Sequence, residues 1–230
     1  MNNTLSIIIP VFNEEDNLVS LIKEIKTALV NYTNFELIFV NDFSSDNTDE
    51  IFLKKIENCK CITHEKNKGQ SESIKTGILN SKYNNIVTID GDLQNDPRDI
   101  PSLIKAYTDL KSIALVGGIR EKRKDNFVKI TSSKIANSFR QFILNDGCPD
   151  TGCGLKIFDK EIFLKLPFFN GIHRFLPALF KGFGYQTAFI KVNHRERISG
   201  VSKYGTLDRL FRGLRDVYRV NKMIKLNMRK

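Results

Sequence analysis

The first 120 residues alternate between short apolar runs and segments in which apolar residues recur at helical spacing. The first run, residues 5–11, is rich in isoleucine, which is typical of a buried strand. Further strands are predicted over residues 35–40, 60–63, 86–89 and 113–116. Predicted helices, in which apolar residues recur at helical spacing, begin after Asn13 and cover residues 48–56, 71–79 and 100–110. Because strand and helix alternate, we expect an α/β fold with a mostly parallel sheet and helices on both faces.

The first predicted helix follows Asn13. Its first turn holds Glu14, Glu15 and Asp16. Asparagine is a favoured N-cap residue, and carboxylates stabilise the positive end of a helix dipole. The sequence therefore predicts a helix that is capped by the Asn13 side chain.

After residue 120 the alternation weakens. Residues 129–144 predict an amphipathic helix, residues 146–154 a turn rich in glycine and cysteine, and residues 187–192 a strand. A last helix is predicted from about Thr206 to about Asn221, with apolar residues along one stripe and arginines mostly off it.

The positive charge lies near the C-terminus. The chain has a net charge of +10, and from residue 191 onward 12 basic residues stand against three acids. Residues 1–190 hold 24 basic residues against 23 acids. We therefore divide the chain into a domain over residues 1–205 and a basic amphipathic helix over residues 206–230. Such a helix suits a polyanion, either a nucleic acid or an anionic membrane surface.

Several classes of protein are disfavoured by composition. No apolar run approaches the roughly 18 residues of a transmembrane helix, and the N-terminus lacks the basic region of a signal peptide. The four cysteines are too few for a disulfide scaffold and lack the paired spacing of a zinc site. The three histidines share no ligand spacing, so we expect them to pack or to lie at the surface. We expect a reduced protein in the cytoplasm.

Carboxylates follow three of the predicted strands, at residues 10–14, 41–46 and 90–94. Ligands bind beyond the carboxyl ends of the strands in an open parallel sheet. No glycine-rich phosphate loop occurs there, so a phosphate ligand facing these acids needs a cation such as Mg²⁺ or Mn²⁺. Asp90 and Asp92 would hold it, with Gly91 between them leaving room for a ligand. The alternative is a solvated acidic turn.

The residues at these strand ends resemble a known family. Three segments are similar to the family-2 glycosyltransferases of GT-A fold: IIIPVFNEEDNL, FVNDFSSDNT and TIDGDLQNDP. Four later segments resemble the polyprenyl-phosphate glycosyltransferases of the dolichol-phosphate mannosyltransferase-like branch: GIREKRKDNFVKITSSKIAN, DTGCGLKIFDKEI, HRFLPAL and RERISGVSKYG. The seven segments occur in the family's order over about residues 4–205. The resemblance implies a GT-A-type sheet and a sugar-transferring enzyme.

The resemblance also implies roles for individual residues. The nucleotide would lie against Pro10, Phe12, Glu14, Val40 and Asp42. The donor diphosphate would lie near Asp90, Gly91 and Asp92, and the metal would be held by Asp90, Asp92 and Gln94. The phosphates would be neutralised by Arg120, Arg197 and Lys203. The acceptor phosphate would contact Lys129 and Ser133, and the implied catalytic residues are Asp92, Arg120 and Lys203.

The chain departs from the family's pattern at four of these positions. Asn41 and Phe43 stand where an aspartate and a glycine are usual. Phe12 replaces a tyrosine and Lys129 replaces an arginine. Phe43 changes the shape of the base pocket. The departures therefore bear chiefly on which nucleobase the donor carries.

The chemistry of a lipid phosphate agrees with this assignment. A phosphate monoester has a second pKa of about 6 and is largely dianionic at neutral pH, so it needs no general base. Arg120, Arg123, Lys129, Arg197 and Lys203, together with a metal, would hold two anions together. We therefore expect transfer of a sugar from a UDP- or GDP-sugar to a polyprenyl phosphate, with inversion, for modification of a cell-envelope glycan or lipid. Asp150 is expected to cap the turn that follows it.

Other functions stay open at this point. A glycosyltransferase that acts on a saccharide hydroxyl would use a carboxylate base, for which Asp150 is the candidate. A nucleotidyltransferase usually has a phosphate loop near the N-terminus, and a nucleic-acid-binding module would explain the basic helix but not the acidic strand ends. We favour the lipid acceptor, with no nucleic-acid partner and a position on the cytoplasmic face of a membrane. A membrane protein that receives the chain is a further candidate partner, which the sequence leaves open.

Overall fold

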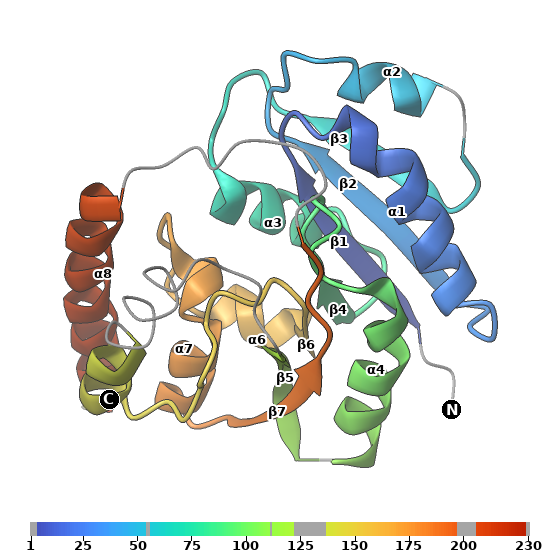
Figure 1. Ribbon diagram of the computed structural model, residues 1–230. Coiled ribbons are helices and arrows are strands. Elements are labelled where there is room, and N and C mark those ends of the chain that lie inside the picture. The colour runs from blue at the N-terminus through green and yellow to red at the C-terminus, as the bar shows by residue number, and fades with distance from the viewer. Residues whose placement is uncertain (1–3, 54–55, 111, 122–136, 197–205, 229–230) are drawn as a thin grey trace.

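The computed structural model describes residues 4–53, 56–110, 112–121, 137–196 and 206–228. Its centre is a seven-stranded sheet with the strand order β3-β2-β1-β4-β6-β5-β7 (Figure 1). The strands are β1 (Leu5–Val11), β2 (Phe35–Asn41), β3 (Cys59–Thr63), β4 (Asn85–Thr88), β5 (Ile113–Arg120), β6 (Lys156–Asp159) and β7 (Gln186–Val192). The α/β class expected from the sequence is confirmed.

The described helices lie between and after these strands. They are α1 (Glu15–Ala28), α2 (Thr48–Leu53), α3 (Gln70–Leu79), α4 (Ile100–Asp109), α6 (Lys160–Lys165), α7 (Leu176–Gly182) and α8 (Thr206–Asn227). Residues 137–144 are also helical, in agreement with the second half of the helix predicted over residues 129–144. Two short 3₁₀ helices are η1 (Pro97–Asp99) and η2 (Ile172–Arg174).

The sheet is mostly parallel, with one exception. Strand β1 pairs in parallel with β2 and β4, β2 with β3, and β5 with β7. Strand β6 runs antiparallel to both of its neighbours, β4 and β5. The sequence analysis missed β6, because four residues between a glycine-rich turn and a helix show no alternation of apolar and polar positions.

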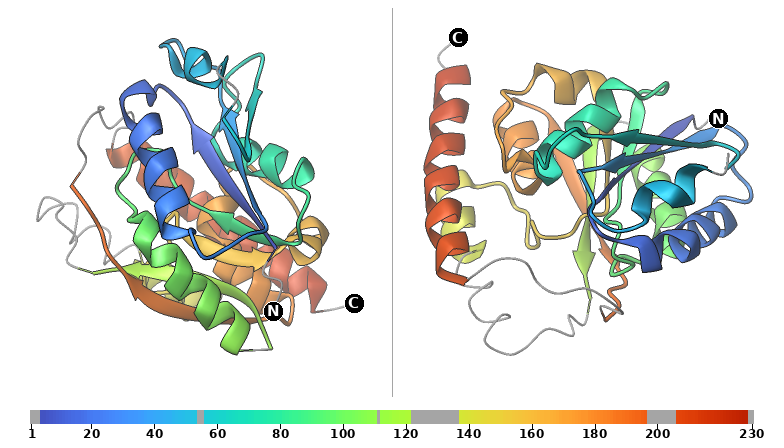
Figure 2. Two further views of the ribbon diagram at one scale, coloured as in Figure 1. Left: turned by 90° about the vertical axis from the view of Figure 1, so that its right-hand side faces the viewer. Right: turned by 90° about the horizontal axis from the view of Figure 1, so that it is seen from above.

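Both faces of the sheet are covered by helices, as the apolar strands require. Successive side chains of a strand point to opposite faces. Ile7 and Ile9 accordingly pack in one core with Leu21 of α1, while Ile8 packs in the other with Ile78 of α3. Figure 2 shows α1 and α4 on one side of the sheet and α3, α7 and α8 on the other. This packing on two sides explains why the inner strands β1, β2, β4 and β5 are mostly apolar, whereas the edge strands β3 and β7 carry more polar residues.

The start of α1 differs from the prediction. The N-cap position is Glu14, and it makes no side-chain capping hydrogen bond. Asn13 instead has a left-handed backbone with φ of 56°, which asparagine tolerates. Its Oδ1 accepts a hydrogen bond from the backbone N–H of Ser45 at 2.8 Å. The prediction of an Asn13 cap is therefore wrong, because the side chain joins the loops after β1 and β2 instead.

Helix α8 packs on α7 with part of its apolar side. Val217 and Val220 are buried in the same core as Leu179 of α7. Gly182 lets the helices approach closely, because a Cβ atom there would overlap with Ile224. Tyr218 lies on the predicted apolar stripe but is 71% exposed. The stripe is thus divided between the protein core and the surface.

Candidate active site

Two aspartates lie just beyond the end of β4. Gly91 separates them, and a Cβ atom at Gly91 would lie 2.8 Å from Cγ1 of Val11, so the turn packs tightly against β1. The carboxylate of Asp92 accepts a hydrogen bond from the backbone N–H of Gln94 at 3.2 Å. Because β1 and β4 are parallel neighbours, this turn lies next to the loop that leaves β1. The predicted carboxylates therefore lie at the carboxyl edge of the sheet.

The carboxylate of Asp90 is enclosed by several segments of the chain. Gln70, the first residue of α3, donates a hydrogen bond from Nε2 to Oδ1 at 2.8 Å. A Cβ atom at Gly154 would overlap with this carboxylate, so glycine is required for the present packing. Burial, and then repulsion from Asp92, raise the pKa of Asp90 to about 6, against attraction by Lys156 and Arg120. Folding thus brings two carboxylates together at a cost that a bound cation would offset.

The turn at residues 150–154 is held by an ion pair. Arg120, at the end of β5, donates from Nε and Nη2 to the two carboxylate oxygens of Asp150 at 2.7 and 2.8 Å. Asp150 also accepts the backbone N–H of Gly152 at 3.2 Å, so the predicted capping role is confirmed. A Cβ atom at Gly152 would lie 2.7 Å from Nη2 of Arg120. Both glycines of this turn therefore make room for charged side chains.

A cavity of about 290 Å³ opens beside Asp90. Its walls come from the ends of β1 and β4, the start of α3, the 150–154 turn, the start of β6, η2 and the first residue of α7. The polar side chains that line it are those of Gln70, Thr88, Asp90, Thr151, Lys156, His173 and Arg174. Pro10 and Asp90 are the two predicted site residues among its lining residues. Lys156 is buried, and its Nζ donates to the carbonyl of Cys153.

The residues predicted to bind the nucleotide have different environments. Asp42 is buried, and its carboxylate accepts from Nδ1 of His64 at 2.8 Å and from the backbone N–H groups of Lys68 and Gly69 at 2.8 and 2.7 Å. It therefore holds the loop before α3 in place. Val40 is fully buried, and its side chain is part of the hydrophobic core that packs against the sheet.

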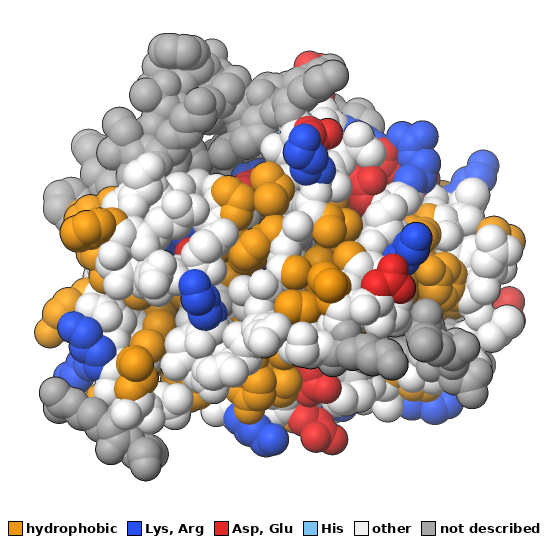
Figure 3. Space-filling view, turned by 90° about the horizontal axis from the view of Figure 1, so that it is seen from below, with side chains coloured by type: hydrophobic (Ala, Val, Ile, Leu, Met, Phe, Trp, Pro, Cys, Tyr) orange, Lys and Arg blue, Asp and Glu red, His pale blue; other side chains and the backbone are white. Residues whose placement is uncertain are grey.

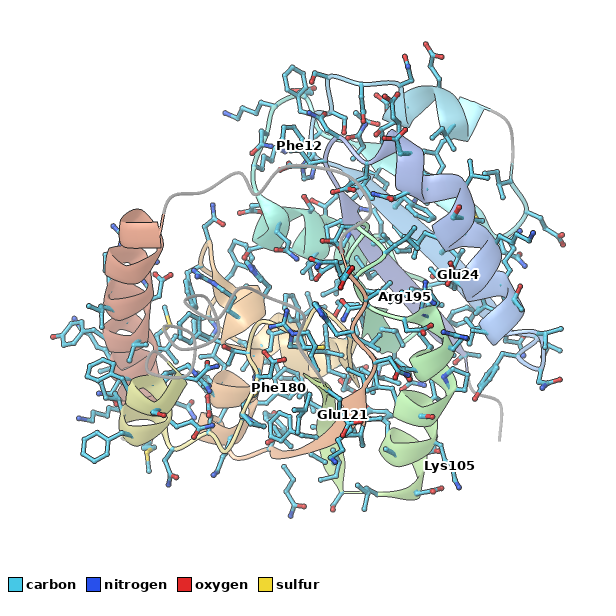
Figure 4. The ribbon with its side chains drawn as sticks, viewed as in Figure 1. Phe12, Glu24, Lys105, Glu121, Phe180 and Arg195 are labelled. Atoms are coloured by element: carbon cyan, nitrogen blue, oxygen red, sulfur yellow. The ribbon has the colours of Figure 1, made fainter. Side chains whose placement is uncertain are left out.

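Two further residues of the predicted nucleotide pocket lie in the loop after β1, whereas Pro10 belongs to β1 itself. Phe12 is half-buried there, near the upper edge of the molecule as drawn in Figure 4. Glu14 accepts a hydrogen bond from Nδ2 of Asn17 at 2.7 Å. The loop is fixed to the loop after β2, since the backbone N–H of Asn13 donates to Oγ of Ser44 at 2.9 Å. The two loops expected to hold the nucleotide therefore form one connected edge.

Five of the residues predicted to hold phosphates lie outside the described residues: Arg123, Lys129, Ser133, Arg197 and Lys203. The described segment before Arg197 is fixed by Arg195. Its guanidinium makes ion pairs with Glu24 of α1 at 2.7 Å and with Asp96 at 2.6 Å (Figure 4). Arg195 therefore anchors the end of this segment to α1 and to the loop after β4.

The sequence analysis assigned no role to Gln70, Lys156, His173 or Arg174, which line the cavity. Lys156, His173 and Arg174 fall within the segments DTGCGLKIFDKEI and HRFLPAL, so their signal was part of the family resemblance. The expectation that the histidines pack is confirmed for His64, which is buried between Asp42 and Thr76. His173 instead combines packing with a place at the cavity.

The acidic pair fits a divalent cation only together with other ligands. Within the described residues, no group of three or more His, Cys, Asp or Glu side chains is arranged to hold a metal ion. Asp90 and Asp92 would supply two carboxylates, and Gln94 an amide oxygen. Mg²⁺ is usually bound through one or two carboxylates plus waters and substrate phosphates. The oxygen ligands present here match that chemistry.

Comparison with solved structures identifies the fold. The chain aligns with glucosyl-3-phosphoglycerate synthase from Mycobacterium tuberculosis, crystallised with Mn²⁺, uridine diphosphate and phosphoglyceric acid, with a TM-score of 0.72 and 21% identity over 94% of this chain and 76% of that one. The fold is thus the GT-A fold of glycosyltransferases. The glycosyl transferase family 2 model matches residues 6–166, and the chain belongs to that family.

Curated relatives are similar over most of the chain. The dodecaprenyl-phosphate galacturonate synthase of Rhizobium johnstonii is 34% identical over 224 residues, which cover 94% of this chain. The undecaprenyl-phosphate 4-deoxy-4-formamido-L-arabinose transferase of Aeromonas hydrophila is 32% identical and covers 90% of it. The chain spans 66% of the length of each of these two relatives.

Proposed function

We propose that this protein transfers a sugar from a nucleotide diphosphate sugar to a polyprenyl phosphate. The observation that carries the proposal is the pair Asp90 and Asp92 at the end of β4, with Arg120 and Lys156 acting on the same carboxylate. Acidic and basic side chains thus lie together where a metal-bound diphosphate would bind. The two relatives named for prenyl-phosphate products support the class of acceptor.

The donor would bind at the edge formed by the loops after β1, β2 and β4. Phe12 and Glu14 would contact the nucleoside, and Asp42 would act by holding the adjoining loop. Asp90, Asp92 and Gln94 would hold Mg²⁺ or Mn²⁺, which as a Lewis acid would stabilise the charge of the departing nucleoside diphosphate. An arginine has five N–H donors, of which Arg120 uses two for the Asp150 carboxylate. Its other donors would bind phosphate.

The acceptor would need no base from the protein. A lipid phosphate is largely dianionic at pH 7, so it would attack the anomeric carbon directly and invert its configuration. The carboxylate oxygens of Asp150 accept hydrogen bonds from Arg120 and Gly152, which favours a structural role over proton abstraction. Lys129, Ser133, Arg197 and Lys203 remain proposed phosphate contacts from the sequence alone.

The direct test is turnover of a donor panel with undecaprenyl phosphate and Mn²⁺. UDP-glucose, UDP-galacturonate and GDP-mannose would each be offered, and transfer to the lipid measured by release of the nucleoside diphosphate. We expect one donor to be consumed only when the lipid phosphate is present. Transfer to a free saccharide with no response to the lipid would contradict the proposed acceptor.

The Asp92→Asn variant tests the metal assignment. We expect it to fold normally and to lose metal-dependent binding of the donor nucleotide, because the neutral amide removes charge that the cation needs. Calorimetric titration of UDP or GDP in Mn²⁺ should show affinity at least tenfold weaker than that of the wild type. Asp109→Asn, an exposed position on α4, is the matched control. Equal affinity in Asp92→Asn and wild type would refute the assignment of Asp92.

We further propose that the enzyme binds the cytoplasmic surface of an anionic membrane through α8. Exposed apolar side chains on and just beyond this helix, Leu214, Tyr218, Leu226 and Met228, accompany exposed basic side chains, Arg215, Lys222 and Lys225. Figure 3 shows hydrophobic side chains beside Lys and Arg along the left edge, the side on which Figure 1 places α8. Among the described helices, none is long and apolar enough to cross a bilayer.

Charge removal on α8 tests this binding without removing its buried residues. Each Lys or Arg near an anionic surface contributes about 1 kcal/mol. The triple variant Arg215→Gln, Lys222→Gln, Lys225→Gln should therefore bind vesicles of anionic phospholipid at least tenfold more weakly in co-sedimentation. The control replaces the exposed lysines Lys23, Lys105 and Lys165 by glutamine and should behave like the wild type. If both triple variants lose binding equally, net charge and not α8 explains it.

A further inference from the structure

The short helix η2 lies between the cavity beside Asp90 and helix α8. On one side, Nδ1 of His173 lies 2.7 Å from Oγ of Ser71 in α3. On the other side, Nη2 of Arg174 lies 3.2 Å from Oδ2 of Asp216, which is buried on α8. Gly171 precedes η2 with a left-handed φ of 115°. The segment that carries His173 is therefore fixed from two directions.

Ser71 determines which nitrogen of His173 carries the proton. Its Oγ accepts a hydrogen bond from the backbone N–H of Gly171 at 2.8 Å. The serine is fully buried, so its hydroxyl hydrogen requires an acceptor. Nδ1 of His173 is at hydrogen-bond distance and can accept only when it carries no proton. The proton of the neutral ring then lies on Nε2.

The surroundings keep this imidazole neutral. Burial, with the charges of Arg174 and Lys156, lowers the pKa of His173 to about 3. The ring is half-buried and lines the cavity with Asp90. Within the part of the chain that the structure describes, Nε2 makes no hydrogen bond to the protein. The cavity wall therefore holds an uncharged N–H donor in the same lining as two cations, Arg174 and Lys156.

A neutral donor suits a sugar oxygen. The two neighbouring cations already have anionic or carbonyl partners, since Arg174 pairs with Asp216 and Lys156 donates to Cys153. A volume of about 290 Å³ lies at the lower end of ligand cavities, which span roughly 300–1,000 Å³, and so suits one sugar and not a whole nucleotide sugar. We propose that His173 binds the sugar of the donor by donating a hydrogen bond from Nε2 to a sugar oxygen beside Asp90. This inference rests on the proposed function.

The test separates binding of the sugar from binding of the nucleotide. With the donor that the wild type consumes fastest in the panel above, His173→Phe should lower kcat/KM about tenfold, the loss of one hydrogen bond to the reacting substrate. The Kd of the corresponding nucleoside diphosphate should not change. His173→Gln keeps an N–H donor and should retain most of the wild-type kcat/KM. Asp109→Asn serves as the surface control.

Each outcome bears on the inference. If the wild type consumes no donor, the proposed function fails, and the inference fails with it. If the wild type is active and His173→Phe keeps the wild-type kcat/KM, or loses nucleotide and sugar binding equally, the inference alone is overturned. Should His173→Phe not fold, long-range ¹H–¹⁵N NMR of the wild type at pH 7 decides the tautomer. A proton on Nε2 supports the inference, and a proton on Nδ1 overturns it.

Discussion

The Asp90→Asn variant is expected to be more stable than the wild type and inactive. Asparagine has nearly the shape of aspartate, so it fits beside Gly154 and its Oδ1 can still accept the hydrogen bond from Gln70. It carries no charge, and folding no longer has to bury a carboxylate near Asp92. The same substitution removes a proposed ligand of the metal. Stability and activity should therefore change in opposite directions.

The pH dependence of this effect follows from the raised pKa. The pKa of Asp90 is about 6 in the folded protein, against 3.8 ordinarily. Ionisation of this group therefore costs folding free energy, which is absent below about pH 4, grows through pH 6 and is complete above it. Two pKa units correspond to about 3 kcal/mol, an upper figure for this half-buried carboxylate. Urea unfolding in EDTA should show the variant more stable at pH 7.5 and equal to the wild type near pH 4.

The control for this prediction is Asp109→Asn, which removes an exposed carboxylate from α4. It should leave both the stability and the sugar transfer of the protein close to the wild-type values. A variant Asp90→Asn that is less stable than the wild type at pH 7.5 would show that the carboxylate is well solvated or well paired. A variant that transfers sugar at the wild-type rate would exclude Asp90 from the site.

The Gly154→Ala variant is expected to lose sugar transfer by about 100-fold while the protein still folds. The added methyl group would overlap with the carboxylate of Asp90, which must move. The carbonyl of Gly154 accepts a hydrogen bond from Oγ1 of Thr88 at 2.7 Å, so the turn itself is held in place. A displacement of about 1 Å in an active site can lower the rate by about 10². Overpacking should cost about 1–3 kcal/mol of stability.

A matched glycine is available on α8. A Cβ atom at Gly213 would have no atom within 4 Å, and alanine is favoured over glycine in a helix by about 1 kcal/mol. Gly213→Ala should therefore be active and slightly more stable, as measured by thermal unfolding and by the transfer assay. If Gly154→Ala transfers sugar as well as Gly213→Ala does, the position of the Asp90 carboxylate is not critical for the reaction.

The sequence alone was sufficient to predict the fold class and the acidic end of β4. Four of the strands from β1 to β5 are apolar runs, with β3 at the edge of the sheet as the exception, and each of the five is separated from the next by a segment of helical spacing. That pattern is local, and buried parallel strands need apolar residues on both faces. Asp90 and Asp92 could be placed in the site because they directly follow such a strand, and the carboxyl ends of parallel strands share one edge.

The tertiary structure decided which side chains meet at that edge. Gln70 reaches Asp90 across 20 residues, and Ser71 reaches His173 across 102. Neither contact leaves a periodic signal in the sequence. The first depends on where α3 begins relative to the end of β4, and the second on how η2 packs against α3. The same is true of Asn13, whose side chain was expected to cap a helix and instead bonds to Ser45. Local pattern determined the elements, whereas their packing determined the lining of the cavity.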